Sequence, residues 1–128
     1  LIPATIFRIF NREDPLVVAG NGTAIRDVIF VEDAVDGILS IMENAPPCVP
    51  VNIGPGKYYS VKDIVNIIIE CSPIKPRIVW DDSKPTGDLV RVLNIDKARE
   101  LLSFEAKYSL KEGIKKTIEW YVESQNGE

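Results

Sequence analysis

Residues 20–43 read GNGTAIRDVIFVEDAVDGILSIME, and this stretch decides the fold. Its opening Gly-Asn-Gly is typical of a tight turn, because glycine adopts backbone conformations that other residues avoid. The β-branched run at 28–31 predicts a strand. The apolar positions that follow recur with the spacing of one helix face, so we expect a helix over 33–44. A turn, a strand and a helix in this order indicate an α/β unit.

The rest of the chain alternates strands and helices around this unit. We expect strands at 16–19, 51–53 and 77–80, an extended segment at 90–94, and helices at 60–71, 96–102 and from 109 onward. Two of these helices open with a capping box, Ser60 with Asp63 and Ser109 with Glu112. The pattern predicts an α/β fold with short, mainly parallel strands and about four or five helices.

Size and charge narrow the class of protein. A chain of 128 residues suits one compact domain, so we treat 1–128 as a single unit. The net charge is −4 and the basic residues are scattered among acids, which argues against a nucleic-acid partner. No apolar run approaches the ~20 residues that a membrane span needs. We therefore expect a cytoplasmic protein without a membrane partner.

The absence of histidine removes several kinds of chemistry. It excludes Ser-His-Asp and Cys-His catalysis and makes a zinc enzyme unlikely on composition. Asp81 and Asp82 alone offer too few oxygen ligands for another metal, so we predict no metal site. The two cysteines, Cys48 and Cys71, lack metal-type spacing, and we expect buried free thiols.

Two motifs look like catalytic or cofactor signatures, and we reject both. Gly54-Pro55-Gly56 resembles the start of a dinucleotide-binding turn, but Tyr59 stands where the third glycine should be. Tyr58 and Lys62 have the Tyr-x-x-x-Lys spacing of a catalytic base and its partner. The helix is expected to begin at Ser60, so the two side chains would not share its face. We predict no catalytic and no cofactor-binding residue in this chain.

Two arginine-bearing loops are candidate anion sites. Arg26 follows the glycine turn, and Arg91 ends a polar loop that also contains Lys84. A guanidinium group can make two parallel hydrogen bonds to a diphosphate. Taken singly, each loop also fits an exposed hairpin or a solvated connection, and the residues alone leave both readings open.

Four segments in sequence order resemble the extended short-chain dehydrogenase/reductase family. They are GNGTAIRDVIFVEDAVDGILSIME at 20–43, VNIGPG at 51–56, KPTGDLVRVLNIDKARELL at 84–102 and SLKEGIKKTIEWY at 109–121. Together they cover nearly the whole chain. The resemblance implies the C-terminal, substrate-binding lobe of an NAD(P)-dependent nucleotide-sugar epimerase, dehydratase or reductase.

The resemblance also implies roles for individual residues. Arg26 would hold the diphosphate of a nucleotide-diphospho-sugar, and Arg91 would assist from the opposite side. The residues expected around the nucleotide or its phosphates are Lys84, Ala19, Gly20 and Pro3, with Ile2 beside the last. The loop Ser83-Lys84-Pro85 is most similar to GDP-fucose synthases. Ala19 departs from the aromatic residue of some of those enzymes, and UDP-sugar 4-epimerases and dTDP-sugar dehydratases remain alternatives.

The family's glycine-rich cofactor loop and its Tyr-x-x-x-Lys helix are missing from this sequence. We therefore expect NAD or NADP to be bound by an N-terminal Rossmann domain of a larger, homodimeric parent enzyme, and this chain to be inactive alone. The start at Leu1 fits that expectation. Apolar surface near 1–10 and on the helix beginning at Asp33 would be exposed without that domain, favouring self-association. A stand-alone, non-catalytic binding module is the alternative.

Overall fold

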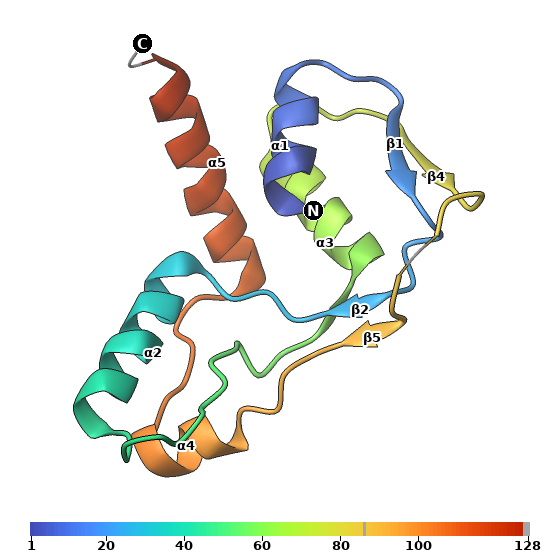
Figure 1. Cartoon of the computed structure of the whole chain (residues 1–128). Helices are drawn as coiled ribbons and strands as arrows, with labels where there is room; N and C mark the ends of the chain where they lie inside the picture. The colour runs from blue at the N-terminus through green and yellow to red at the C-terminus, as the bar shows by residue number, and fades with distance from the viewer. Residues whose placement is uncertain (86, 127–128) are drawn as a thin grey trace.

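Helices and short strands alternate along the chain in the computed structural model, which describes residues 1–85 and 87–126. The elements are α1 Ile2–Phe10, β1 Leu16–Ala19, β2 Ile25–Arg26, α2 Val31–Asn44, β3 Tyr59–Ser60, α3 Val61–Cys71, β4 Ile78–Asp81, β5 Val90–Arg91, α4 Asp96–Leu102 and α5 Leu110–Asn126 (Figure 1). The expected α/β class and the number of helices are confirmed.

The strands form two small sheets. β1 lies parallel to β4, with Leu16 opposite Ile78. In the second sheet β2 is central, parallel to β5 and antiparallel to β3. Two of these three pairings are parallel, as expected. Both sheets bring chain segments together that are more than 50 residues apart in the sequence.

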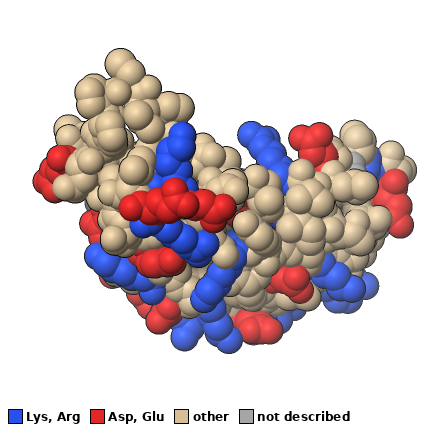
Figure 2. Space-filling view, turned by 90° about the horizontal axis from the view of Figure 1, so that it is seen from below, with Lys and Arg blue, Asp and Glu red and all other residues tan. Residues whose placement is uncertain are grey.

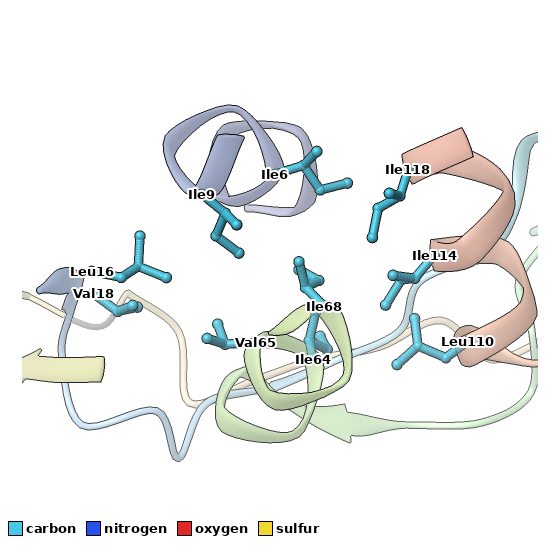
Figure 3. Close-up of a cluster of buried hydrophobic side chains, with 10 residues drawn as sticks. All are labelled: Ile6, Ile9, Leu16, Val18, Ile64, Val65, Ile68, Leu110, Ile114 and Ile118. Atoms are coloured by element: carbon cyan, nitrogen blue, oxygen red, sulfur yellow. The ribbon is translucent and has the colours of Figure 1, made fainter. Parts of the chain in front are cut away.

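The main core forms around α3, which lies between α1, β1 and α5 (Figure 3). Ile64, Val65 and Ile68 of α3 are fully buried, and burial of such a side chain contributes about 1.5–3 kcal/mol. α3 begins with the predicted capping box: the Asp63 amide donates to Ser60 Oγ at 3.0 Å, and the Ser60 amide donates to the Asp63 carboxylate at 3.1 Å. The second predicted capping box, at the start of α5, is also present.

A second, smaller core lies beneath α2. It contains Ile95, Ala98 and Phe104, with Ile53 packed against them. α2 approaches this core closely, because a Cβ at Gly37 would lie only 2.7 Å from Ile53 Cγ2. Only glycine fits at this contact.

One buried carboxylate fastens α2 to the segment that leads into α5. Asp33, 1% exposed, accepts hydrogen bonds from the backbone amides of Lys107 at 2.9 Å and Tyr108 at 3.1 Å. A buried charge is tolerated only where such partners satisfy it. Asp33 therefore joins two segments that are more than 70 residues apart.

Two of the predicted strands were wrong. The strand expected at 28–31 lies earlier, at Ile25–Arg26. The Leu93 amide donates to the Asp27 carboxylate at 2.9 Å instead of to a backbone carbonyl, so the pairing of β2 with β5 ends there. The segment 51–53 is not a strand in the described residues, since nothing pairs with it. The sequence analysis assigned no element to residues 1–10, where the structure has α1, which buries Ile6 and Ile9 and carries Pro3 in its first turn, a favoured place for proline.

The molecular surface combines mixed charges with exposed apolar side chains. Figure 2 shows acidic and basic residues interspersed on the face it presents. Leu1 and Phe7 of the N-terminal segment are about half exposed, as are several apolar residues of α2. This agrees with the apolar surface expected near residues 1–10 and on the helix beginning at Asp33. Cys48 is exposed, which corrects the expected burial, and both thiols are free.

Candidate functional site

A cavity of about 630 Å³ opens where β1 and β2 reach their carboxyl ends. The first turns of α1 close one side, and Pro85 borders another. Pro3, Ala19 and Arg26 all contribute to its lining. The carboxyl ends of strands are the usual ligand-binding edge of α/β folds, and a volume of a few hundred Å³ suits a small molecule.

Arg26 and Arg91 are neighbours at this edge. They are register partners in the parallel pair of β2 and β5, so their side chains project from the same face of the sheet. The Arg26 guanidinium donates from Nη1 to the Ile25 carbonyl at 2.7 Å. Within residues 1–85 and 87–126, neither arginine forms an ion pair with a carboxylate. Two arginines at paired positions of adjacent strands, without an acidic partner among the described residues, favour an anionic ligand.

The remaining predicted residues lie around the cavity without all lining it. Gly20 has a φ of +79° and donates its amide to the Asp81 carbonyl at 2.8 Å. Lys84 is exposed, and its Nζ lies 3.4 Å from the Asp81 carboxylate. Pro3, Ala19 and Arg26 therefore line the cavity, while Gly20, Lys84 and Arg91 flank it.

Arg8 also lines the cavity, and the sequence analysis missed it. Its Nε donates to the Glu13 carboxylate at 2.7 Å, and its Nη2 donates to the Val17 carbonyl at 2.7 Å. Its Nη1 has no hydrogen bond to any described residue, so it is available to a ligand. The missed signal was helical spacing, because Ala4 and Arg8 are four residues apart on one face of α1.

The ion pair of Arg8 predicts a pH dependence. The hydrogen bond from Arg8 lowers the pKa of the Glu13 carboxyl below its ordinary value. A depressed carboxyl pKa stabilises the folded state above the unfolded pKa, about 4.3 for glutamate, and the contribution is lost as the pH falls through the folded pKa. Thermal unfolding at pH 7 and pH 3 should therefore show a smaller acid destabilisation for Glu13→Gln than for wild type. An identical loss in both proteins would contradict a role of Glu13 in this window.

The described residues provide no obvious acid–base pair. Tyr58 lies outside α3, which begins at Val61, so it does not share a helix face with Lys62. Tyr108 donates its hydroxyl to Glu32 at 2.6 Å, and this bond raises the pKa of Tyr108, the opposite of what a tyrosine base needs. No group of three potential metal ligands occurs in the described part of the chain. None of its described helices combines the length and apolarity needed to cross a bilayer.

The amino-acid sequence of this chain is similar to those of known proteins. The profile of the family described as GDP-mannose 4,6 dehydratase matches residues 1–117. The GDP-L-fucose synthase of Escherichia coli K12 is 28% identical over 120 residues, which cover 87% of this chain and 37% of that protein. The chain spans about a third of the length of the curated relatives it matches.

Solved structures show the same fold. The UDP-glucose 4-epimerase of Thermotoga maritima, determined with UDP-glucose, is 28% identical with a TM-score of 0.86, over 97% of this chain and 40% of that one. The Bordetella bronchiseptica enzyme WbmF, in complex with NAD+ and UDP, is 29% identical with a TM-score of 0.77, over 98% of this chain and 36% of that one.

Proposed function

Because this chain belongs to the GDP-mannose 4,6 dehydratase family of extended short-chain dehydrogenases/reductases, we propose that it is the nucleotide-diphospho-sugar-binding lobe of an NAD(P)-dependent epimerase, dehydratase or reductase. One observation carries this proposal. Arg26 lines a cavity, Arg91 is its register partner on the adjacent strand, and no described carboxylate pairs with either. A diphosphate supplies the two negative charges that such a pair attracts.

In this proposal the lobe binds the substrate and leaves its sugar free to react. The two guanidinium groups hold the diphosphate, and Arg8 adds a third donor from α1. Pro3, Ala19 and Gly20 border the nucleotide, with Lys84 near its phosphates. Binding energy from such remote groups positions the reacting sugar and supports catalysis without contact with the reacting atoms.

The redox chemistry would come from the rest of the parent enzyme. A bound NAD or NADP would supply hydride-transfer chemistry, and the complex of WbmF contains NAD+. In this chain the turn at Gly54 lacks the third small residue that a dinucleotide turn needs. We therefore assign the cofactor to an N-terminal Rossmann domain and expect this chain to be inactive alone. The homodimer of the parent stays a prediction.

Among the subfamilies, we favour a GDP-sugar substrate. The loop Ser83-Lys84-Pro85 and the similarity to GDP-L-fucose synthase support it. The similarity to a UDP-glucose 4-epimerase supports UDP-sugars as the alternative. A stand-alone binding module is the second functional class. A glycine-rich βαβ segment and a Tyr-x-x-x-Lys helix encoded before Leu1 would identify the enzyme, and a start codon close to Leu1 would favour the module.

Calorimetric titration of the whole protein tests the proposal. GDP-, UDP- and dTDP-sugars are compared, with the free sugars and inorganic phosphate as controls. We expect one nucleotide class to bind more tightly than the others and the free sugars not to bind. Absent binding of all three nucleotide-sugars would refute the proposed function, and equal binding of all three would refute the preference for a GDP-sugar.

A further inference from the structure

The turn that leads into β2 contains an asparagine directly followed by glycine. Asn21 is exposed, and Gly22 has a φ of +77°. Glycine has no side chain beside its own amide, so that nitrogen can approach the carboxamide carbon of the residue before it. Asparagine is also chemically labile, and proteins adapted to high temperature contain fewer of it. The pair Asn21-Gly22 is therefore a candidate for a spontaneous reaction within the chain.

Hydrogen bonds hold the Asn21 side chain in a position that favours this reaction. Its Oδ1 accepts from the Thr23 amide at 3.0 Å and from the Thr23 hydroxyl at 2.7 Å. Because these donors lie two residues ahead, the carboxamide is bent over the intervening Gly22 peptide. Both donors contact the oxygen that gains negative charge when a nucleophile attacks the carboxamide carbon, and donors placed in this way stabilise the transition state.

The Gly22 nitrogen is the nearest nucleophile to that carbon in the chain. Its N–H forms no hydrogen bond to any described residue, whereas the Gly22 carbonyl accepts from the Lys62 amide at 2.9 Å. Gly22 also packs against Trp80, where a Cβ would lie only 2.7 Å from the ring. A larger residue does not fit at this position, so packing keeps glycine next to Asn21.

We propose that Asn21 is a site of spontaneous modification through a succinimide ring. The Gly22 nitrogen loses its proton to solvent and bonds to Cγ of Asn21. The bond from Cγ to Nδ2 then breaks, and Nδ2 takes up a proton and leaves as ammonia. Water hydrolyses one of the two ring carbonyl groups, which leaves an aspartyl residue if the ring opens at Cγ and an isoaspartyl residue if it opens at the backbone carbonyl. The net reaction consumes one water and releases one ammonia, without oxidation or reduction.

The isoaspartyl product would alter the turn beside the substrate cavity. It adds one methylene group to the backbone between two fixed points. On one side the Gly20 amide donates to the Asp81 carbonyl at 2.8 Å, and on the other the Gly22 carbonyl accepts from the Lys62 amide. The added length must displace one of these contacts, and Gly20 borders the nucleotide in the proposed function, on which this consequence rests. We therefore expect the isoaspartyl form to bind a nucleotide-sugar more weakly.

Peptide mapping by mass spectrometry tests the modification in the whole protein, incubated for several weeks at pH 6 and at pH 8. We expect the peptide that contains Asn21 to gain about 1 Da, and to do so faster at pH 8 because the attacking nitrogen must lose a proton. Asn44 and Asn52 are the controls, since both are exposed but are followed by alanine and isoleucine. Conversion should be at least about tenfold faster at Asn21 than at either control, and equal rates would overturn the inference. Mapping also separates Asn21 from the second Asn-Gly pair of the sequence, at 126–127.

Asn21→Ser is the matched variant for the effect on the site. A serine oxygen can accept from the same Thr23 amide but offers no carbonyl to attack. The isoaspartyl form, purified from aged wild-type protein and identified with isoaspartate methyltransferase, should bind the preferred nucleotide-sugar about tenfold more weakly than fresh protein. Aged Asn21→Ser should bind as tightly as fresh Asn21→Ser, and an equal loss in both proteins would overturn the assigned effect. Conversion at Asn21 in a protein that binds no nucleotide-sugar when fresh would refute the proposed function and retain the modification.

Discussion

Arg26→Ala is expected to weaken the binding of a nucleotide-diphospho-sugar to the whole protein by about 10- to 160-fold, or about 1.5–3 kcal/mol. The guanidinium is half-buried at the cavity, next to Arg91 and without a carboxylate partner in the described structure. Its removal would eliminate charge-assisted hydrogen bonds to the diphosphate. Isothermal titration of both proteins with the preferred nucleotide-sugar measures the change.

Arg77→Ala is the matched control for this prediction. Arg77 is also an arginine beside a strand, but it is exposed and pairs with Asp14, away from the cavity residues. Its loss should leave the dissociation constant unchanged. Arg91→Ala should weaken binding in the same direction, and the double variant should lose less than the sum of the two changes, because both groups act on one diphosphate. Wild-type affinity in Arg26→Ala would refute the diphosphate role.

Asp33→Ala is expected to reduce the free energy of unfolding by about 3–5 kcal/mol, the cost of removing a buried carboxylate that accepts from two partly buried backbone amides. The carboxylate is almost inaccessible to solvent and accepts from Lys107 and Tyr108. Its loss would release the start of α2 from the segment before α5. Urea unfolding followed by circular dichroism measures the difference.

The control for Asp33 lies one turn further along the same helix. Asp36 is exposed and, among the residues that the structure describes, pairs only with Lys107 Nζ at 2.6 Å. An exposed ion pair contributes about 0–1 kcal/mol. Asp36→Ala should therefore be nearly neutral. An equal loss of stability in the two variants would mean that the buried carboxylate is not what joins α2 to this segment.

Elements specified by local signals were predicted from the sequence, and elements that depend on distant partners were not. The capping boxes at Ser60 and Ser109 mark two helix starts, and the helix at 96–102 has the predicted bounds. The positions of the strands were predicted less well. The hydrogen bond that ends the pairing of β2 with β5 joins the Asp27 carboxylate to the Leu93 amide, which lies 66 residues further along the sequence. No local pattern reports such a contact.

The same limit applies to the candidate site. Arg26 and Arg91 could be selected from the family resemblance, but their adjacency depends on the pairing of β2 with β5. Arg8 was missed because the N-terminal helix that carries it was not recognised. For segment 51–53 the sequence predicted a strand that the structure does not form. Its residues have a strand-like pattern, but no described segment of this chain pairs with it.

The pairing of β2 with β5 is only two residues long and holds two positive side chains abreast. Like charges directly opposite each other on adjacent strands repel, so the two arginines weaken the pairing of β2 with β5 in the three-stranded sheet. A dianion bound between the arginines would offset this repulsion and link the two strands. Ligand binding would then stabilise the pairing of β2 with β5. Without ligand and at low ionic strength, this pairing would be least stable.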